Sequence, residues 1–103
     1  MNQTWQLELS PQATVDLKGF DQTERTQIAK GIDKLKTEPR LRGHSLQGNL
    51  SGFRSLVVGK RKIRIIFRII DSTVTVLVIA IGHRHNDEVY LQAATRTDDS
   101  PEG

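Results

Sequence analysis

Hydrophobic residues between positions 53 and 81 fall into three runs separated by short polar segments. Residues 53–58 and 63–70 alternate or mix apolar side chains with a few charged ones, and residues 73–81 are apolar at nearly every position. Runs of this length that are rich in β-branched residues predict strands, and a strand that is apolar on both faces is expected at the centre of a sheet. Gly82 is expected to end the last strand.

The first half of the chain predicts a short strand followed by two helices. Apolar and polar residues alternate from Trp5 to Leu9, which predicts a half-buried strand. Ser10-Pro11 is typical of a helix N-cap followed by proline at the first helical position. Asp21 and Glu24 have the spacing of a capping box, so they predict the start of a second helix, which Glu38-Pro39 should end.

These elements predict an α+β fold of the order β-α-α-β-β-β. We expect a small, mostly antiparallel four-stranded sheet, two helices packed on one of its faces, and a short C-terminal helix that begins near Asn86 or Asp87. Residues 40–52 are expected to form a loop because they contain three glycines. The chain is interpreted as a single domain over residues 1–94, followed by a flexible polar tail over residues 95–103.

Charge is distributed unevenly along the chain. The chain has a net charge of +3, but this charge is not spread evenly. The middle third, residues 36–68, has nine basic residues and one acidic residue, whereas both flanking thirds are net negative. Such segregation favours a face that binds a polyanion, although an ordinary solvated surface is the alternative. The chain has no cysteine, no signal-peptide pattern and no membrane-length apolar run, so a cytoplasmic protein is expected.

The motifs of several enzyme classes are absent. The sequence contains no GxSxG, no Walker A motif and no GxGxxG. His83 and His85, together with Asp87 or Glu88, could hold a metal, but this spacing is weak and contact with phosphate or solvent is the favoured alternative. We therefore expect neither a metal nor another cofactor.

The remaining cations, histidines and single tyrosine are suited to phosphodiester cleavage in RNA. In that reaction the 2′-hydroxyl attacks phosphorus, a base removes its proton, and fixed cations stabilise the charge on the phosphoryl oxygens. Arg64 and Arg68 share one face of their strand. We interpret Arg64 as facing a ligand and Arg68 as structural. Tyr90 is either a proton-transfer group or a core residue at the start of the last helix.

Three blocks of the sequence resemble a known family: residues 46–56 (LQGNLSGFRSL), residues 64–67 (RIIF), and residues 81–84 (IGHR) with Glu88-Val89-Tyr90. With them the chain, from Trp5 to about Ala93, resembles the RelE-type toxins of the RelE/ParE superfamily, which belong to bacterial type II toxin–antitoxin systems. The last block resembles the ribosome-dependent RNases of that superfamily more than its gyrase-directed ParE branch.

The resemblance implies a toxin that inhibits translation by cleaving mRNA in the ribosomal A site. It implies that Arg64 and Arg84 bind the scissile phosphate, and that Tyr90 lies near the 2′-hydroxyl as a base or an orienting group. Arg54 matches a basic position that is often lysine in the family, whereas Leu56 stands where a second lysine is common.

Further RNA contacts are expected from the basic turn and from the histidines that flank Arg84. These residues are Lys60, Arg61, Lys62, His83 and His85. One residue of the turn could replace the lysine that is missing at Leu56.

The resemblance also implies partners. They are a cognate RelB-like antitoxin, the mRNA and the ribosome, and promoter DNA reached indirectly through the antitoxin complex. The antitoxin is expected to cover the basic groove with an acidic or amphipathic segment, or to displace the final helix. Two other functions stay open: a ParE-like toxin that inhibits DNA gyrase, and a non-catalytic nucleic-acid-binding module.

Overall fold

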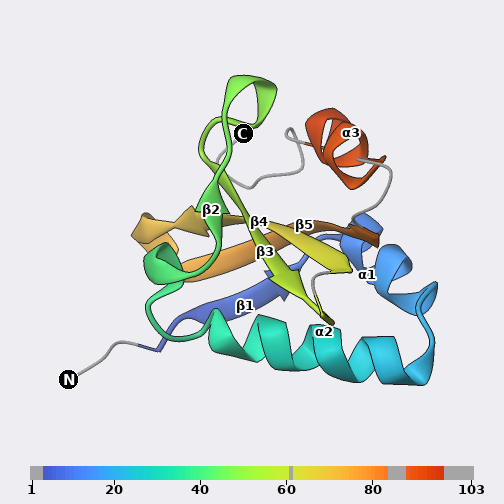
Figure 1. Cartoon of the computed structure of the whole chain (residues 1–103). Coiled ribbons are helices and arrows are strands. Elements are labelled where there is room, and N and C mark those ends of the chain that lie inside the picture. Colours follow the sequence, from blue (N-terminus) through green and yellow to red (C-terminus); the bar gives the residue numbers. More distant parts are fainter. Residues whose placement is uncertain (1–3, 61, 84–87, 97–103) are drawn as a thin grey trace.

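A computed structural model describes residues 4–60, 62–83 and 88–96 of the chain (Figure 1). Within these residues the helices and strands follow one another in this order: β1 (Gln6–Leu9), α1 (Pro11–Lys18), α2 (Gln22–Lys34), β2 (His44–Ser45), β3 (Phe53–Val58), β4 (Ile63–Ile70), β5 (Thr75–His83) and α3 (Glu88–Thr95). Single 3-10 turns precede β2, β3 and β5, at Pro39–Leu41, Gly48–Leu50 and Asp71–Thr73.

The strands form one sheet in the order β1-β5-β4-β3-β2. β1 pairs with β5 in parallel, and the other neighbouring strands are antiparallel. The expected α+β class is confirmed, but the expected count of four strands is one too low. The additional strand is β2, which has only two residues and lies inside the expected loop over residues 40–52.

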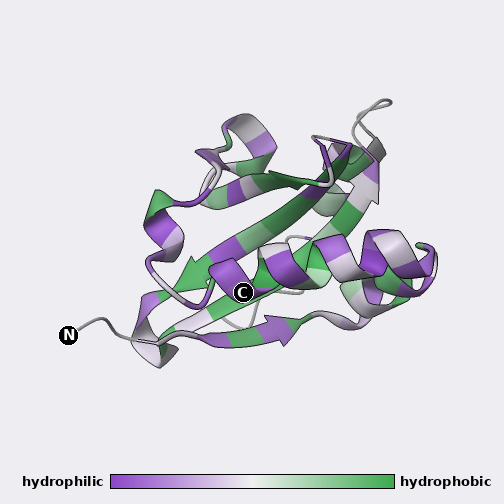
Figure 2. Cartoon of the chain, turned by 60° about the horizontal axis from the view of Figure 1, so that its bottom comes forward, coloured by the Kyte–Doolittle hydropathy of each residue, from purple (hydrophilic) through white to green (hydrophobic). Residues whose placement is uncertain are grey.

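Helices cover both faces of the sheet. Figure 1 shows α2 below the sheet and α3 above it, and α1 packs in the same apolar cluster as α2. Below the sheet, helix residues such as Ala13 and Ile28 pack with Ile65 and Phe67 of β4. Above it, Val89 of α3 belongs to a second apolar cluster. The central strands are largely hydrophobic in Figure 2, as expected for strands that are buried on both faces.

Both predicted helix starts are confirmed. The Ser10 side chain accepts a hydrogen bond from the Ala13 N–H, and Asp21 and Glu24 form a reciprocal capping box. The predicted end of α2 at Glu38 is wrong, because the helix ends at Lys34. The carbonyl of Lys36 instead accepts a hydrogen bond from the backbone of Trp5, so the chain leaves the helix early to reach the start of β1.

β5 runs through Gly82 to His83, so the prediction that Gly82 ends this strand is wrong. Glycine is needed there for close packing, because a Cβ atom at this position would lie 2.7 Å from Cβ of Val89. The register also shifts along β5: Ile66 pairs with Ala80 but Phe67 pairs with Val78. The additional residue between these partners bends the strand beneath α3.

Candidate functional site

Arg64 and Tyr90, which come from different elements, meet on the α3 face of the sheet. Arg64 lies in β4, opposite Val57 of β3 and Gly82 of β5. Its guanidinium carbon is 4.8 Å from the centroid of the Tyr90 ring. A guanidinium at this distance from an aromatic ring is attracted by the negative face of the ring. The structure therefore brings these two predicted site residues together.

Helix α3 holds Tyr90 in this position. Val89 and Ala93 on the same helix are fully or almost fully buried against the sheet, whereas Tyr90 is half-buried. The hydroxyl of Tyr90 is 3.3 Å from Oγ of Ser55, a β3 residue that is only 4% exposed. A buried serine is a fixed partner, so this hydrogen bond sets the direction of the phenol group.

One donor of Arg64 has no partner among the described residues. Its Nε atom is buried and makes no hydrogen bond there, although a guanidinium N–H donor is strongly polar. Leaving such a donor unpaired costs on the order of 1–3 kcal/mol, and more for a charged group. An incoming anion with an oxygen at this position would remove that cost. Arg64 is thus suited to bind a phosphate.

Arg68 lies on the same face of β4, farther along the strand. It pairs with Phe53 of β3, and its guanidinium carbon is 5.9 Å from the centroid of the Phe53 ring. This contact with a core aromatic residue is consistent with the structural role expected for Arg68.

Arg54 lies on the other face of the sheet. It is opposite Phe67, which packs in the core beneath α1 and α2. Its guanidinium donates hydrogen bonds to the carbonyls of Arg42 and Gly43, at 3.0 and 3.2 Å, and to Oγ of Ser45 at 2.8 Å. The structure does not group Arg54 with Arg64 and Tyr90. In this arrangement Arg54 holds the segment that leads into β2.

His83 also lies away from Arg64 and Tyr90. It pairs with Ile63 at the end of β5, on the face covered by α1 and α2. Its Nε2 is 3.2 Å from Oε2 of Glu24, and its ring centroid is 5.0 Å from that of Phe20. Within the residues described, no three His, Cys, Asp or Glu side chains come together as a metal site would require.

Three of the predicted site residues lie outside the described residues: Arg61, Arg84 and His85. Asp87, considered above as a metal ligand, is also outside them, as are residues 97–103 of the expected tail. The other two residues assigned to the tail are described. Thr95 is the last residue of α3, and Arg96 is paired with Asp16.

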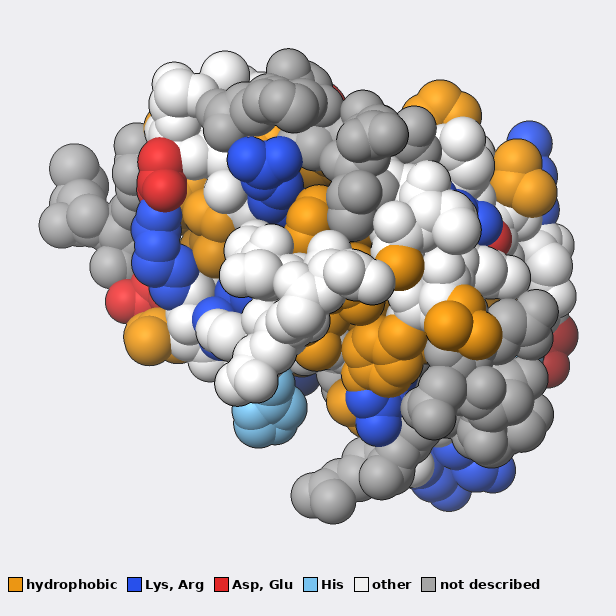
Figure 3. All heavy atoms as spheres, turned by 90° about the horizontal axis from the view of Figure 1, so that it is seen from above, with side chains coloured by type: hydrophobic (Ala, Val, Ile, Leu, Met, Phe, Trp, Pro, Cys, Tyr) orange, Lys and Arg blue, Asp and Glu red, His pale blue; other side chains and the backbone are white. Residues whose placement is uncertain are grey.

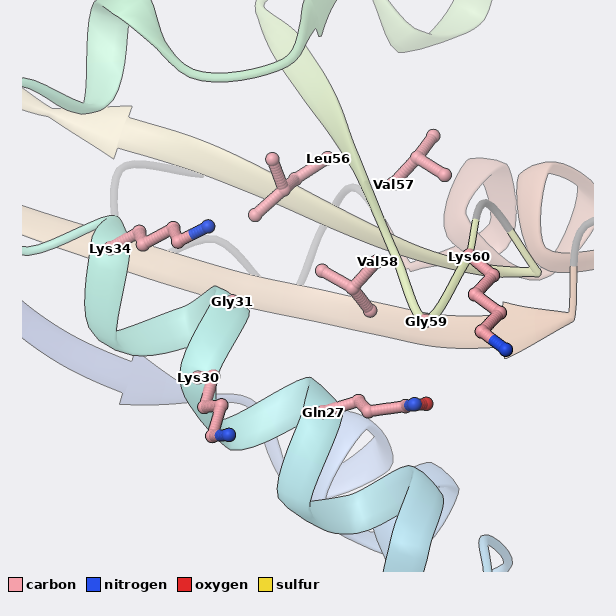
Figure 4. Close-up of a pocket in the computed structure, with 9 residues that line it drawn as sticks. All are labelled: Gln27, Lys30, Gly31, Lys34, Leu56, Val57, Val58, Gly59 and Lys60. Atoms are coloured by element: carbon pink, nitrogen blue, oxygen red, sulfur yellow. The ribbon is translucent and has the colours of Figure 1, made fainter.

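Lysines line a hollow between α2 and β3 (Figure 4). Lys30 and Lys34 come from α2 and Lys60 from the turn after β3, and the hollow has a volume of about 280 Å³. Leu56 and Val58 form part of its apolar lining. Lys60 was predicted as an RNA contact, and Lys62 of the same turn is exposed.

Lys30 and Lys34 were not predicted as site residues. Their signal in the sequence is the four-residue spacing, which places both side chains on one face of a helix. Leu56, which stands where the resemblance leads one to expect a lysine, belongs to this hollow and not to the Arg64 face.

The α3 side of the molecule combines apolar and basic side chains. Seen from this side, Lys and Arg side chains lie between exposed apolar ones, and a histidine is exposed (Figure 3). A surface of this kind offers both charged and apolar contacts to a ligand.

The fold and this site agree with comparison to known proteins. Residues 7–88 match the family model described as the ParE toxin of the type II toxin–antitoxin system parDE. The chain belongs to this toxin family. The expected identity as a toxin of the RelE/ParE superfamily is thereby confirmed.

Individual relatives of this toxin carry the RelE name. The chain is 27% identical over 90 residues to the mRNA interferase toxin RelE of Escherichia coli K12, a match that covers 87% of this chain and 94% of the relative. Among solved structures, a mutant of E. coli RelE in the free state superposes with a TM-score of 0.77 at 24% identity, covering 91% of this chain and 98% of that one.

The fold also matches a toxin that was solved together with its antitoxin. The intact E. coli RelBE toxin–antitoxin complex contains a chain that superposes with a TM-score of 0.70 at 22% identity, covering 80% of this chain and 99% of that one. None of the helices described in this toxin is long and apolar enough to cross a membrane.

Proposed function

We propose that this toxin is a ribosome-dependent endoribonuclease that cleaves mRNA in the A site and thereby inhibits translation. The observation that carries the proposal is the buried, unpartnered Nε of Arg64 beside the ring of Tyr90. A phosphodiester supplies the missing acceptor, and it places a ribose next to the phenol. The similarity to the E. coli mRNA interferase toxin RelE supports the same reaction.

In this reaction the 2′-hydroxyl of the mRNA attacks the adjacent phosphorus. Negative charge grows on the phosphoryl oxygens as the bond to the 5′ oxygen breaks. Arg64 stabilises that charge because its guanidinium is always protonated and its position is fixed by the sheet and by Tyr90. From the resemblance we assign a second phosphate contact to Arg84.

The decisive measurement is primer extension on a translated mRNA after a short pulse of toxin expression. We expect new cuts that depend on translation. Arg64→Ala should weaken them roughly 100-fold or more, because it removes a fixed donor to the transition state. Tyr90→Phe and Arg84→Ala should also reduce them. Lys18→Ala, which removes an exposed cation from α1, is the matched control and should cut normally.

A second candidate is inhibition of DNA gyrase without hydrolysis. The match of residues 7–88 to the ParE family model favours it. It predicts growth arrest with damaged DNA and intact mRNA. Cuts that vanish in the Arg64→Ala variant would exclude this candidate, whereas arrest without cuts would exclude the RNase.

We also propose that a RelB-like antitoxin binds this toxin and holds it inactive; the same fold occurs in the E. coli RelBE toxin–antitoxin complex. In this proposal mRNA and the ribosome are the targets, and promoter DNA is contacted through the antitoxin. Mixing the toxin with its antitoxin should abolish the cuts described above.

A further inference from the structure

A histidine that the sequence patterns did not single out lies on the same face as Ser55 and Tyr90. His44 is the first residue of β2, and it pairs directly with Ser55 of β3. In an antiparallel pair, residues directly opposite each other project from the same face, with Cβ atoms about 4.5–5.5 Å apart. The His44 side chain therefore stands beside Ser55, whose Oγ is 3.3 Å from the Tyr90 hydroxyl.

Contacts of the neighbouring residues support this orientation independently. Ser45 accepts a hydrogen bond from Arg54, 2.8 Å long, on the opposite face of the sheet. Leu46, two residues after His44, packs in the apolar cluster beneath α3. Because side chains alternate along an extended segment, His44 and Leu46 project together toward α3 and Ser45 projects away from it.

His44 is exposed, unlike the serine beside it. Its exposed imidazole lies on the sheet face that also carries the half-buried Tyr90 phenol and the Arg64 Nε, which has no acceptor among the described residues, so a substrate bound on this face can reach it. The cluster of His44, Ser55, Arg64 and Tyr90 thus draws on β2, β3, β4 and α3. Leu56 has no group that can accept a proton, so the lysine expected there is not available as a base.

We propose that His44 is a catalytic residue of the endoribonuclease, namely the base that accepts the proton of the attacking 2′-hydroxyl. This inference rests on the proposed function and adds the proton acceptor to it. Histidine is suited to this role as a residue type, because a neutral imidazole accepts a proton readily near pH 7.

A ring nitrogen of His44 takes the 2′-hydroxyl proton while the 2′ oxygen forms a bond to phosphorus. The bond from phosphorus to the 5′ oxygen breaks, and that oxygen receives a proton from the Tyr90 hydroxyl. The products are a 2′,3′-cyclic phosphate and a 5′-hydroxyl, and solvent returns the proton from the imidazolium to the phenolate. Arg64 stabilises the phosphoryl oxygens throughout.

The experiment measures single-turnover cleavage of a defined mRNA on ribosomes by purified toxin. His44→Ala and His44→Asn should each cut roughly 100-fold more slowly than the original toxin, with unchanged thermal unfolding. Added imidazole should restore much of the lost rate in both variants, since it supplies the missing base. Gln47→Ala, at an exposed position three residues away, should cut at the original rate.

Each alternative gives a different result. If His44 only contacts phosphate, His44→Lys will cut normally and imidazole will not help, which overturns the proposal. If His44→Ala cuts at the original rate, His44 is not catalytic although the RNase function stands. If the original toxin makes no cuts, the proposed function fails and the inference fails with it. Arg64→Ala should be slow but not rescued by imidazole, which confirms that rescue reports the missing base.

Discussion

At the scale of single residues, a shift of one position along a strand decides from which face of the sheet a side chain projects. Arg54 and Ser55 are neighbours, yet Arg54 binds the segment before β2 while Ser55 contacts Tyr90 on the other face. The same alternation separates His83 from Gly82, which lies opposite Arg64. The candidate site is therefore narrow, and its geometry depends on how closely α3 can approach Gly82.

Gly82→Ala tests this close approach. The added Cβ would lie 2.7 Å from Cβ and 3.1 Å from Cγ2 of Val89, so α3 must move away from the sheet. We expect the free energy of unfolding to fall by about 1–3 kcal/mol, as is typical of overpacking, and RNA cleavage to fall because Tyr90 moves with the helix. Urea denaturation and the cleavage assay measure the two effects.

Gly19→Ala is the matched control. Gly19 has an ordinary helical backbone with φ of −79°, and its added Cβ would meet only a backbone oxygen of Asp16 at 3.4 Å. We expect unchanged or slightly higher stability there, because alanine reduces the freedom of the unfolded chain. Equal effects of the two substitutions would contradict the role given to Gly82.

At the scale of elements, side chains supply the hydrogen-bond partners of the β5 backbone beyond the point where β1 stops pairing with it. β1 ends at Leu9, opposite Val78, and the next groups on that edge of β5 need other partners. Asp16 of α1 accepts a hydrogen bond from the N–H of Ile81 at 3.0 Å. Arg96, directly after α3, donates to the carbonyl of Ile79 at 3.0 Å and to Asp16 at 2.7 Å. This ion pair links α1, β5 and the end of α3.

Asp16→Ala should therefore destabilise the toxin by about 3 kcal/mol. Both side chains of the pair are largely buried, with 14% and 15% exposed, so the substitution leaves the Arg96 charge and the Ile81 N–H without their acceptor. Urea denaturation of Asp16→Ala, Arg96→Ala and the double variant gives the coupling energy. The exposed pair of Asp33 and Lys36 is the control, and Asp33→Ala should cost less than about 1 kcal/mol. Similar costs at the two pairs would refute this role of Asp16.

The elements that could be predicted from the sequence are those with a local signal. Ser10 and Asp21 mark helix starts by short-range hydrogen bonds, and the hydrophobic runs of β3, β4 and β5 mark strands. β2 could not be found in this way, because two residues show no periodicity. The register shift in β5 also has no local signal, since it appears only when Phe67 and Val78 pair.

For the candidate site, the strand pattern and residue chemistry already singled out Arg64 and offered Tyr90, and the resemblance assigned roles to both; the structure brings the two together. Residue type and family position say nothing about the strand face, so Arg54 and His83 were included although they lie on the opposite one. His44 was missed because only the strand pairing links it to the site: it lies opposite Ser55, eleven residues along the chain, and Ser55 contacts Tyr90. Such a relation depends on tertiary pairing, which no sequence motif encodes.

At the scale of the whole molecule, basic residues lie on two separate surfaces. Arg64 lies on the α3 face, whereas Lys30, Lys34 and Lys60 line the hollow between α2 and β3. These surfaces are on opposite sides of the sheet. Arg64 and Lys60 come from the basic middle third of the sequence, whereas Lys30 and Lys34 come from the first third. A single acidic partner segment must pass around the sheet edge formed by β2 and by residues 56–58 of β3, which β2 does not pair with, to neutralise both.

Hydrogen–deuterium exchange of the toxin with and without its antitoxin tests where that partner binds. We expect slower exchange within residues 54–64, which flank the lysine-lined hollow, or changed exchange within residues 83–93, where the antitoxin would displace α3. Charge complementarity predicts the first region, because an acidic segment gains most beside Lys30, Lys34 and Lys60. Replacing these three lysines with glutamate should then weaken binding at least tenfold and reduce its salt dependence, whereas Lys18→Glu at an exposed position of α1 should have little effect. Protection confined to peptides outside both regions and outside α2 would show that the antitoxin inhibits the toxin without covering either basic surface.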